Sequence, residues 1–166
     1  MQHNLFCLVL MKYKRHNENG ELRLRSLRWD ARSRETRRSI VRWIALSLGV
    51  ISPGETRLSA VAVLDAILNF QLAEKRDPQV PELKTYIEKY WSQMNEKTLR
   101  YHLLQLKNMG IISSTKRHYH LTWPEIGEQY DGEAWINAYL DGQVEPVRNK
   151  LNIAIRELKS RGYDGK

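Results

Sequence analysis

The clearest hydrophobic pattern in the chain is a set of leucines at helical spacing: Leu99, Leu103 and Leu106. Apolar positions that recur every three to four residues mark the buried face of a helix, so we predict a helix over residues 95–109. Asn95 can cap its first turn, because the side-chain oxygen can accept a hydrogen bond from an unpaired amide there. Gly110 can end it in the left-handed conformation that helix ends favour.

Two short strands are predicted after this helix. Residues 111–113 are short and β-branched, and residues 118–122 alternate polar and apolar side chains. The connection, residues 114–117, is polar and contains two cations, Lys116 and Arg117. The pattern therefore predicts a hairpin with a basic tip.

Two more helices are predicted upstream. Residues 58–75 form an apolar helical pattern, and a second helix opens near Pro81, where proline in the first turn loses no hydrogen bond. Their apolar positions are Val61, Leu64, Ile67, Leu68 and Leu72 in the first, and Leu83, Tyr86, Ile87 and Tyr90 in the second. Together with the hairpin, these helices define a segment over residues 53–123.

The segments on either side read as extensions. Over residues 1–52 we predict a β-hairpin (residues 5–29) and a helix that Asp30 caps and Gly49 ends. Over residues 124–166 we predict helical stretches separated by turns at residues 131–132 and 141–142. The last helix, residues 145–161, has an apolar stripe: Val147, Leu151, Ile155 and Leu158. The predicted fold class is mainly α with a small β part (α+β).

The central segment resembles the winged helix-turn-helix regulators of archaea and bacteria. The resemblance rests on Thr98-Leu99-Arg100-Tyr101-His102-Leu103, then Leu106, Gly110-Ile111-Ile112 and Tyr119-His120-Leu121-Thr122. It is close over residues 95–122 and looser over residues 58–122. It implies a helix that enters the DNA major groove and a hairpin wing beside it. The stretch between Leu83 and Thr98 is longer than the tight turn of compact bacterial repressors.

The face opposite the leucines carries the candidate DNA-binding residues. Those on the predicted helix are Lys97, Thr98, Arg100, Tyr101, Gln105 and Asn108. The cations of this set, Lys97 and Arg100, suit phosphates or bases, and its amide and hydroxyl groups suit base edges or phosphates. At the wing tip, Lys116 and Arg117 suit the DNA backbone or the minor groove. The alternative is an ordinary solvated face, and Leu104 falls on it without an explanation.

The charge of the chain is concentrated near its N-terminus. The net charge is +8, and residues 12–42 hold eleven Lys or Arg against four acids. Within this segment Arg34, Arg38 and Arg42 are four residues apart, so on one helix they would share a face. Such a row can neutralise phosphates as counterions are released. It can equally be a row of solvated arginines, some of them paired with Asp30 or Glu35; the concentration of charge favours a binding patch.

Other classes of protein find little support. There is one cysteine, Cys7, and no apolar run long enough to span a bilayer, so we expect an intracellular, cytoplasmic protein without a membrane partner, associated with the nucleoid if it binds DNA. His118 and His120 share a strand face but have no nearby third ligand, so no metal is expected. We found no phosphate loop, nucleophile elbow or acidic cluster, so we expect neither an enzyme nor a cofactor.

Two hypotheses follow. The first is a sequence-specific protein for double-stranded DNA, a transcription regulator that acts as a homodimer through its C-terminal helices. The second is a winged-helix interaction module in a replication, transcription or RNA-processing assembly, where the same surface meets a protein or structured RNA. The charge outside the winged-helix segment keeps the second hypothesis open.

Overall fold

The computed structural model describes residues 23–126 and 128–161. In these residues the fold is mainly helical with one two-stranded antiparallel sheet, which confirms the predicted α+β class. The elements, in chain order, are α2 (Ala31–Arg34), α3 (Arg37–Ser47), α4 (Ser59–Leu68), the π-helix η1 (Asn69–Ala73), α5 (Val80–Tyr90), α6 (Glu96–Asn108), β1 (Ile112–Thr115), β2 (His118–Leu121) and α7 (Gly132–Arg161). None of the described helices is long and apolar enough to cross a membrane.

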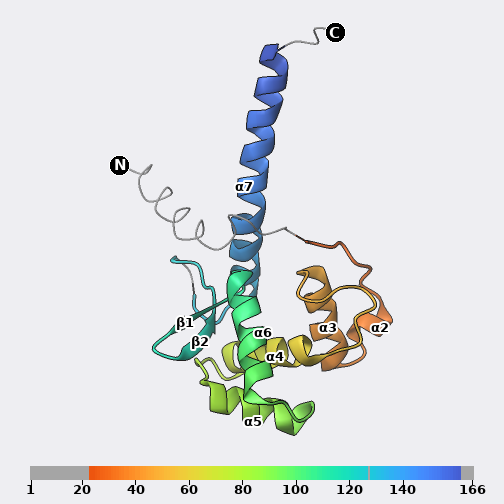
Figure 1. Cartoon of the computed structure of the whole chain (residues 1–166), viewed down its shortest axis with the longest axis vertical. Coiled ribbons are helices and arrows are strands. Elements are labelled where there is room, and N and C mark those ends of the chain that lie inside the picture. Colours follow the sequence, from red (N-terminus) through yellow and green to blue (C-terminus); the bar gives the residue numbers. More distant parts are fainter. Residues whose placement is uncertain (1–22, 127, 162–166) are drawn as a thin grey trace.

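Helix α4 is the centre of the core. Every residue from Ala60 to Leu68 is buried, because nearly all of them are apolar and the helix is surrounded. Helices α3, α5 and α6 and strand β2 all pack against it (Figure 1). Helix α6 contributes the predicted leucine face: Leu99, Leu103 and Leu106 are each at most 1% exposed. These helices and the small sheet form one body.

The predicted helix over residues 58–75 is only partly α-helical. The α-helix ends at Leu68, and the chain continues as the wider π-turn η1. The wider turn shifts the register of the side chains, so Leu72, expected in the core, is 38% exposed. Gln71 is buried instead: its amide donates to the Arg76 carbonyl (2.7 Å) and accepts from the Leu121 backbone N–H (3.1 Å). A buried amide thus ties the end of this helix to the sheet.

Helix α6 and the hairpin follow the prediction closely. The Asn95 side chain accepts from the Thr98 backbone N–H (2.8 Å), and Gly110 follows the helix with φ +74°. The strands pair from Ile112 opposite Leu121 to Thr115 opposite His118. The connection is shorter than expected, since only Lys116 and Arg117 lie between the strands. The predicted tip at residues 114–117 is corrected to these two residues, because residues 114 and 115 pair in β1.

The N-terminal prediction is only partly within the described residues. The first strand and the turn of the expected hairpin lie outside them, and residues 23–29 contain no strand. The expected helix from Asp30 to Leu48 is wrong as one element, because it breaks between α2 and α3. The reason is that Thr36 acts as a second N-cap: its side chain accepts a hydrogen bond from the Ser39 backbone N–H (3.1 Å), so a new helix, α3, begins after it. Gly49 ends α3 as expected, with φ +75°.

The C-terminal prediction is wrong about its turns. The described residues between 123 and 131, which are all of them except residue 127, contain no helix, and α7 runs without interruption through the expected turn at residues 141–142. Asp131, which directly precedes α7, caps the N-terminus of this helix: its carboxylate lies 2.9 Å from the Glu133 backbone nitrogen. Trp135 and Tyr139, in the first turns of α7, are buried against the rest of the body. This packing holds the helical conformation through a glycine that would otherwise favour a turn.

Candidate nucleic-acid interface

The outward face of α6 presents most of the residues predicted to bind DNA. Five of the six are exposed: Lys97, Arg100, Tyr101, Gln105 and Asn108. Thr98 is half-buried, and its backbone N–H is used by the cap. Leu104, which the pattern placed on this face, is 56% exposed. The leucines on the opposite side fix the helix, so this face is rigidly displayed.

Tyr101 and Gln105 are held in place by a series of hydrogen bonds that extends to helix α4. Gln105 donates from its amide nitrogen to the Tyr101 hydroxyl (2.9 Å). Its amide oxygen lies 2.9 Å from Nδ1 of His102, and Nε2 of His102 lies 2.8 Å from the Ser59 hydroxyl. If Nδ1 carries the proton, His102 donates to Gln105 and accepts from Ser59. The second N–H of the Gln105 amide stays available to a ligand.

The two candidate cations of α6, Lys97 and Arg100, differ in their surroundings. Arg100 forms an ion pair with Glu96, one turn earlier, at 2.7 Å. Both side chains are more than half exposed, and exposed pairs of this kind contribute little to stability. A phosphate can therefore replace Glu96 at low cost. Lys97 has no ion pair within the described residues.

The hairpin tip has an unusual backbone. Lys116 and Arg117 both have positive φ, 49° and 68°, which is the type I′ turn that glycine and asparagine normally occupy. A side chain in this conformation costs free energy. Two adjacent cations are thus held on a tight turn that disfavours them. Strained positions of this kind cluster at functional sites.

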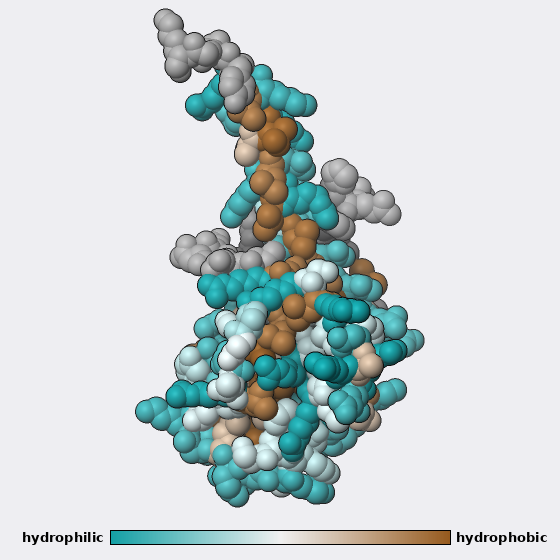
Figure 2. All heavy atoms as spheres, turned by 90° about the vertical axis from the view of Figure 1, so that its right-hand side faces the viewer, coloured by the Kyte–Doolittle hydropathy of each residue, from teal (hydrophilic) through white to brown (hydrophobic). Residues whose placement is uncertain are grey.

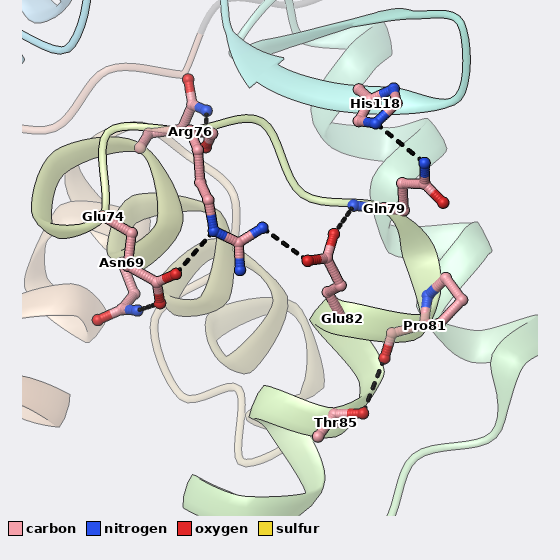
Figure 3. A network of polar contacts seen from close by, with 9 residues as sticks. Asn69, Glu74, Arg76, Gln79, Pro81, Glu82, Thr85 and His118 are labelled. Atoms are coloured by element: carbon pink, nitrogen blue, oxygen red, sulfur yellow. Dashed lines mark hydrogen bonds and ion pairs between the residues drawn. The ribbon is translucent and has the colours of Figure 1, made fainter.

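A polar network supports the hairpin of β1 and β2 from below (Figure 3). Nδ1 of His118 lies 3.1 Å from the Lys116 carbonyl oxygen, and Nε2 lies 2.9 Å from the Gln79 side chain at the start of α5. The Gln79 backbone N–H donates to Glu82 (2.7 Å), and this bond is the main reason that the pKa of the Glu82 carboxyl lies below its usual value. Glu82 also pairs with Arg76 at 2.6 Å. The hairpin is therefore fixed to α5.

The arginine row is not a single surface. Arg34 lies on α2, whereas Arg38 and Arg42 lie on α3, because the helix breaks between them. Arg38 donates to the Tyr90 carbonyl, and its guanidinium lies 4.7 Å from the centre of the Trp91 ring. Its role in the structure is to dock α3 on the end of α5. The expectation of one cationic face is therefore corrected.

A neighbouring arginine that the sequence did not single out has a structural role. Arg37 donates to the buried carboxylate of Asp65 (2.7 Å). The Tyr86 hydroxyl (3.2 Å) and the Trp91 indole N–H (2.9 Å) donate to the same carboxylate. Burial, followed by the nearby Asp65 charge, raises the pKa of Tyr86. This cluster joins α3, α4 and α5 on one buried acid, and nothing in the periodicity indicated it.

The described residues contain no group of three or more side chains suited to a metal ion. Comparisons with known proteins give no further guide: no family model, no curated protein and no solved structure matches this chain. Its interpretation therefore rests on its own residues.

Proposed function

We propose that this chain is a winged helix-turn-helix protein that binds double-stranded DNA and regulates transcription. In this proposal α4, α5 and α6 are the three helices, α6 enters the major groove, and β1 and β2 form the wing. The observation that supports it most directly is the exposed polar face of α6, held by His102 and Ser59 beside a hairpin with two cations at its tip.

Each candidate residue then has a role. Lys97 and Arg100 neutralise phosphates, and Lys116 and Arg117 contact the backbone or the minor groove. The side chains able to read base edges are Thr98, Tyr101, Gln105 and Asn108. Among these, Gln105 is the strongest candidate, because an amide can pair with adenine and this one is already oriented.

The test compares Gln105→Ala with Asn152→Ala, which removes an exposed amide from the distant part of α7. Binding is measured by fluorescence anisotropy on a preferred duplex and on a scrambled one. We expect Gln105→Ala to lose about 1–3 kcal/mol of discrimination between the two, the value of one good base contact. Asn152→Ala should keep the wild-type ratio. Equal ratios for all three proteins would reject α6 as the reading helix.

One observation favours an alternative, a module that binds a protein or structured RNA. Leu104 and Tyr101 are both 56% exposed on the same face of α6, and exposed apolar side chains suit a protein partner. Weak binding that does not distinguish DNA sequences in the same anisotropy assay would support this alternative.

A further inference from the structure

Among the residues that the structure describes, the outer part of α7 leaves the body without packing against another element (Figure 1). Every residue from Pro146 to Arg161 is exposed. This segment nevertheless carries large apolar side chains: Val147 (42% exposed), Leu151 (60%), Ile153 (58%), Ile155 (52%) and Leu158 (58%). Apolar surface of this extent on a projecting helix indicates a partner.

Three of these side chains, Val147, Leu151 and Leu158, lie on one continuous stripe; Ile155, which the sequence pattern placed on the stripe, lies beside it, and Ala154 takes its place in the regular repeat. The spacing alternates between four and three residues along Leu140, Val144, Val147, Leu151, Ala154 and Leu158. This is the repeat of a coiled coil, in which such positions meet the same positions of another helix. At its lower end the stripe merges with apolar surface of the body, as the brown band in Figure 2 shows. Ile153 lies on the opposite side of the helix, off the stripe.

We propose that residues 144–161 of α7 pair in antiparallel orientation with the same residues of a second copy of this chain. The sizes of the side chains support this orientation. In an antiparallel pair, Leu151 meets Ala154 of the second copy, and Leu158 meets Val147, so large side chains face smaller ones. In a parallel pair, Ala154 would face Ala154 and leave a gap between leucine layers.

The charges beside the stripe support the same arrangement. Lys150 and Glu157 lie on one side of it, seven residues apart. In the antiparallel register Lys150 faces Glu157 of the second copy, and the two-fold symmetry repeats this pair. In a parallel pair Lys150 would face Ile155 instead. Within the described residues Lys150 has no ion pair, and Glu157 has only a loose one to Arg161 at 3.7 Å.

The antiparallel pair does not depend on DNA binding, so the two proposals fail separately. The first test is sedimentation of the full chain, without DNA, over a series of protein concentrations. We expect a dimer for the wild type and for Ile153→Glu, and a monomer for Leu151→Glu. The two replaced side chains are apolar, similar in size and nearly equally exposed on one helix, so the comparison tests their position relative to the stripe. Circular dichroism checks that both variants remain helical.

A second measurement fixes the orientation. Cys7 is the only cysteine of the chain, so a single spin label can be attached in the Cys7→Ser, Ser160→Cys variant. In the antiparallel register residue 160 lies opposite residue 145, so two labels should be about 25 Å apart, from a rise of about 1.5 Å per residue and a helix separation of about 10 Å. A separation of about 10 Å would overturn the antiparallel arrangement. A monomeric wild type, or dissociation by Ile153→Glu, would overturn the interface.

Discussion

At the scale of residues, the tip of the hairpin between β1 and β2 combines a strained backbone conformation with two positive charges. Lys116 and Arg117 occupy left-handed positions that Asn-Gly fills without strain. We expect the double substitution Lys116→Asn, Arg117→Gly to raise the free energy of unfolding by about 1 kcal/mol or more, because strain at each position is relieved. It should also weaken DNA binding and make its salt dependence shallower by up to about 1.8, since two phosphate contacts are lost.

Urea unfolding and binding at several salt concentrations measure these two effects. The control is the double substitution of both residues by asparagine, which removes the charges but keeps a side chain at residue 117. If Asn-Gly leaves both the stability and the salt slope unchanged, the cations neither strain the turn nor touch phosphate.

His102 gives a second test at this scale. Because it connects Gln105 to Ser59, His102→Ala should lower discrimination between DNA sequences almost as much as Gln105→Ala does. The double variant should lose little more than either single one, as expected for residues that act as a unit. Additive losses in this cycle would mean that His102 does not position Gln105.

Helix caps could be predicted from the sequence, but side-chain contacts between residues far apart in the sequence could not. Asn95 and Asp30 cap helices as predicted, because a cap depends only on the next three residues. The side chain of Arg37, in contrast, finds Asp65 twenty-eight residues away, and His102 finds Ser59 forty-three residues away. Such partners are brought together by helix packing, which periodicity describes only as a buried face.

At the scale of elements, the break between α2 and α3 changes the role of the basic segment. Arg38 is used to dock α3, whereas Arg34 is exposed on α2. We expect Arg38→Ala to lower the free energy of unfolding by about 1 kcal/mol, through loss of a hydrogen bond and a cation–π contact. Arg34→Ala should leave stability unchanged and, if it touches phosphate, make the salt slope shallower by about 0.9.

Thermal unfolding and salt titration of the two variants separate these roles. The opposite pattern, in which Arg38→Ala affects only the salt slope, would show that Arg38 binds phosphate and does not dock α3 on α5.

The elements themselves show why prediction succeeded in one region and failed in another. Helix α6 and the hairpin carry strong, short-range patterns, and both were placed to within a residue or two. Helix α7 was divided because Asp-Gly normally favours a turn. It continues because Gln143, the next residue, is buried against the body, within 3.5 Å of the Met109 carbonyl oxygen. Tertiary contacts of this kind override local preference.

At the scale of the whole molecule, the projecting helix sets how two DNA-binding surfaces would be related. A two-fold pair through α7 presents two copies of α6 to DNA in inverted order. We expect the wild type to protect an inverted repeat, whereas Leu151→Glu should bind a single half-site with lower affinity. Footprinting on a site with one half mutated distinguishes the two. A direct repeat would contradict the two-fold arrangement.

The central claim is that α6 reads DNA sequence, and selection of bound duplexes from a random pool tests it most directly. The wild type is selected at moderate salt beside the Gln105→Ala variant, and the enriched duplexes are sequenced. We expect the wild type to enrich a defined motif and Gln105→Ala to relax the preference at one position of that motif. A wild-type pool no different from the starting pool would contradict the claim.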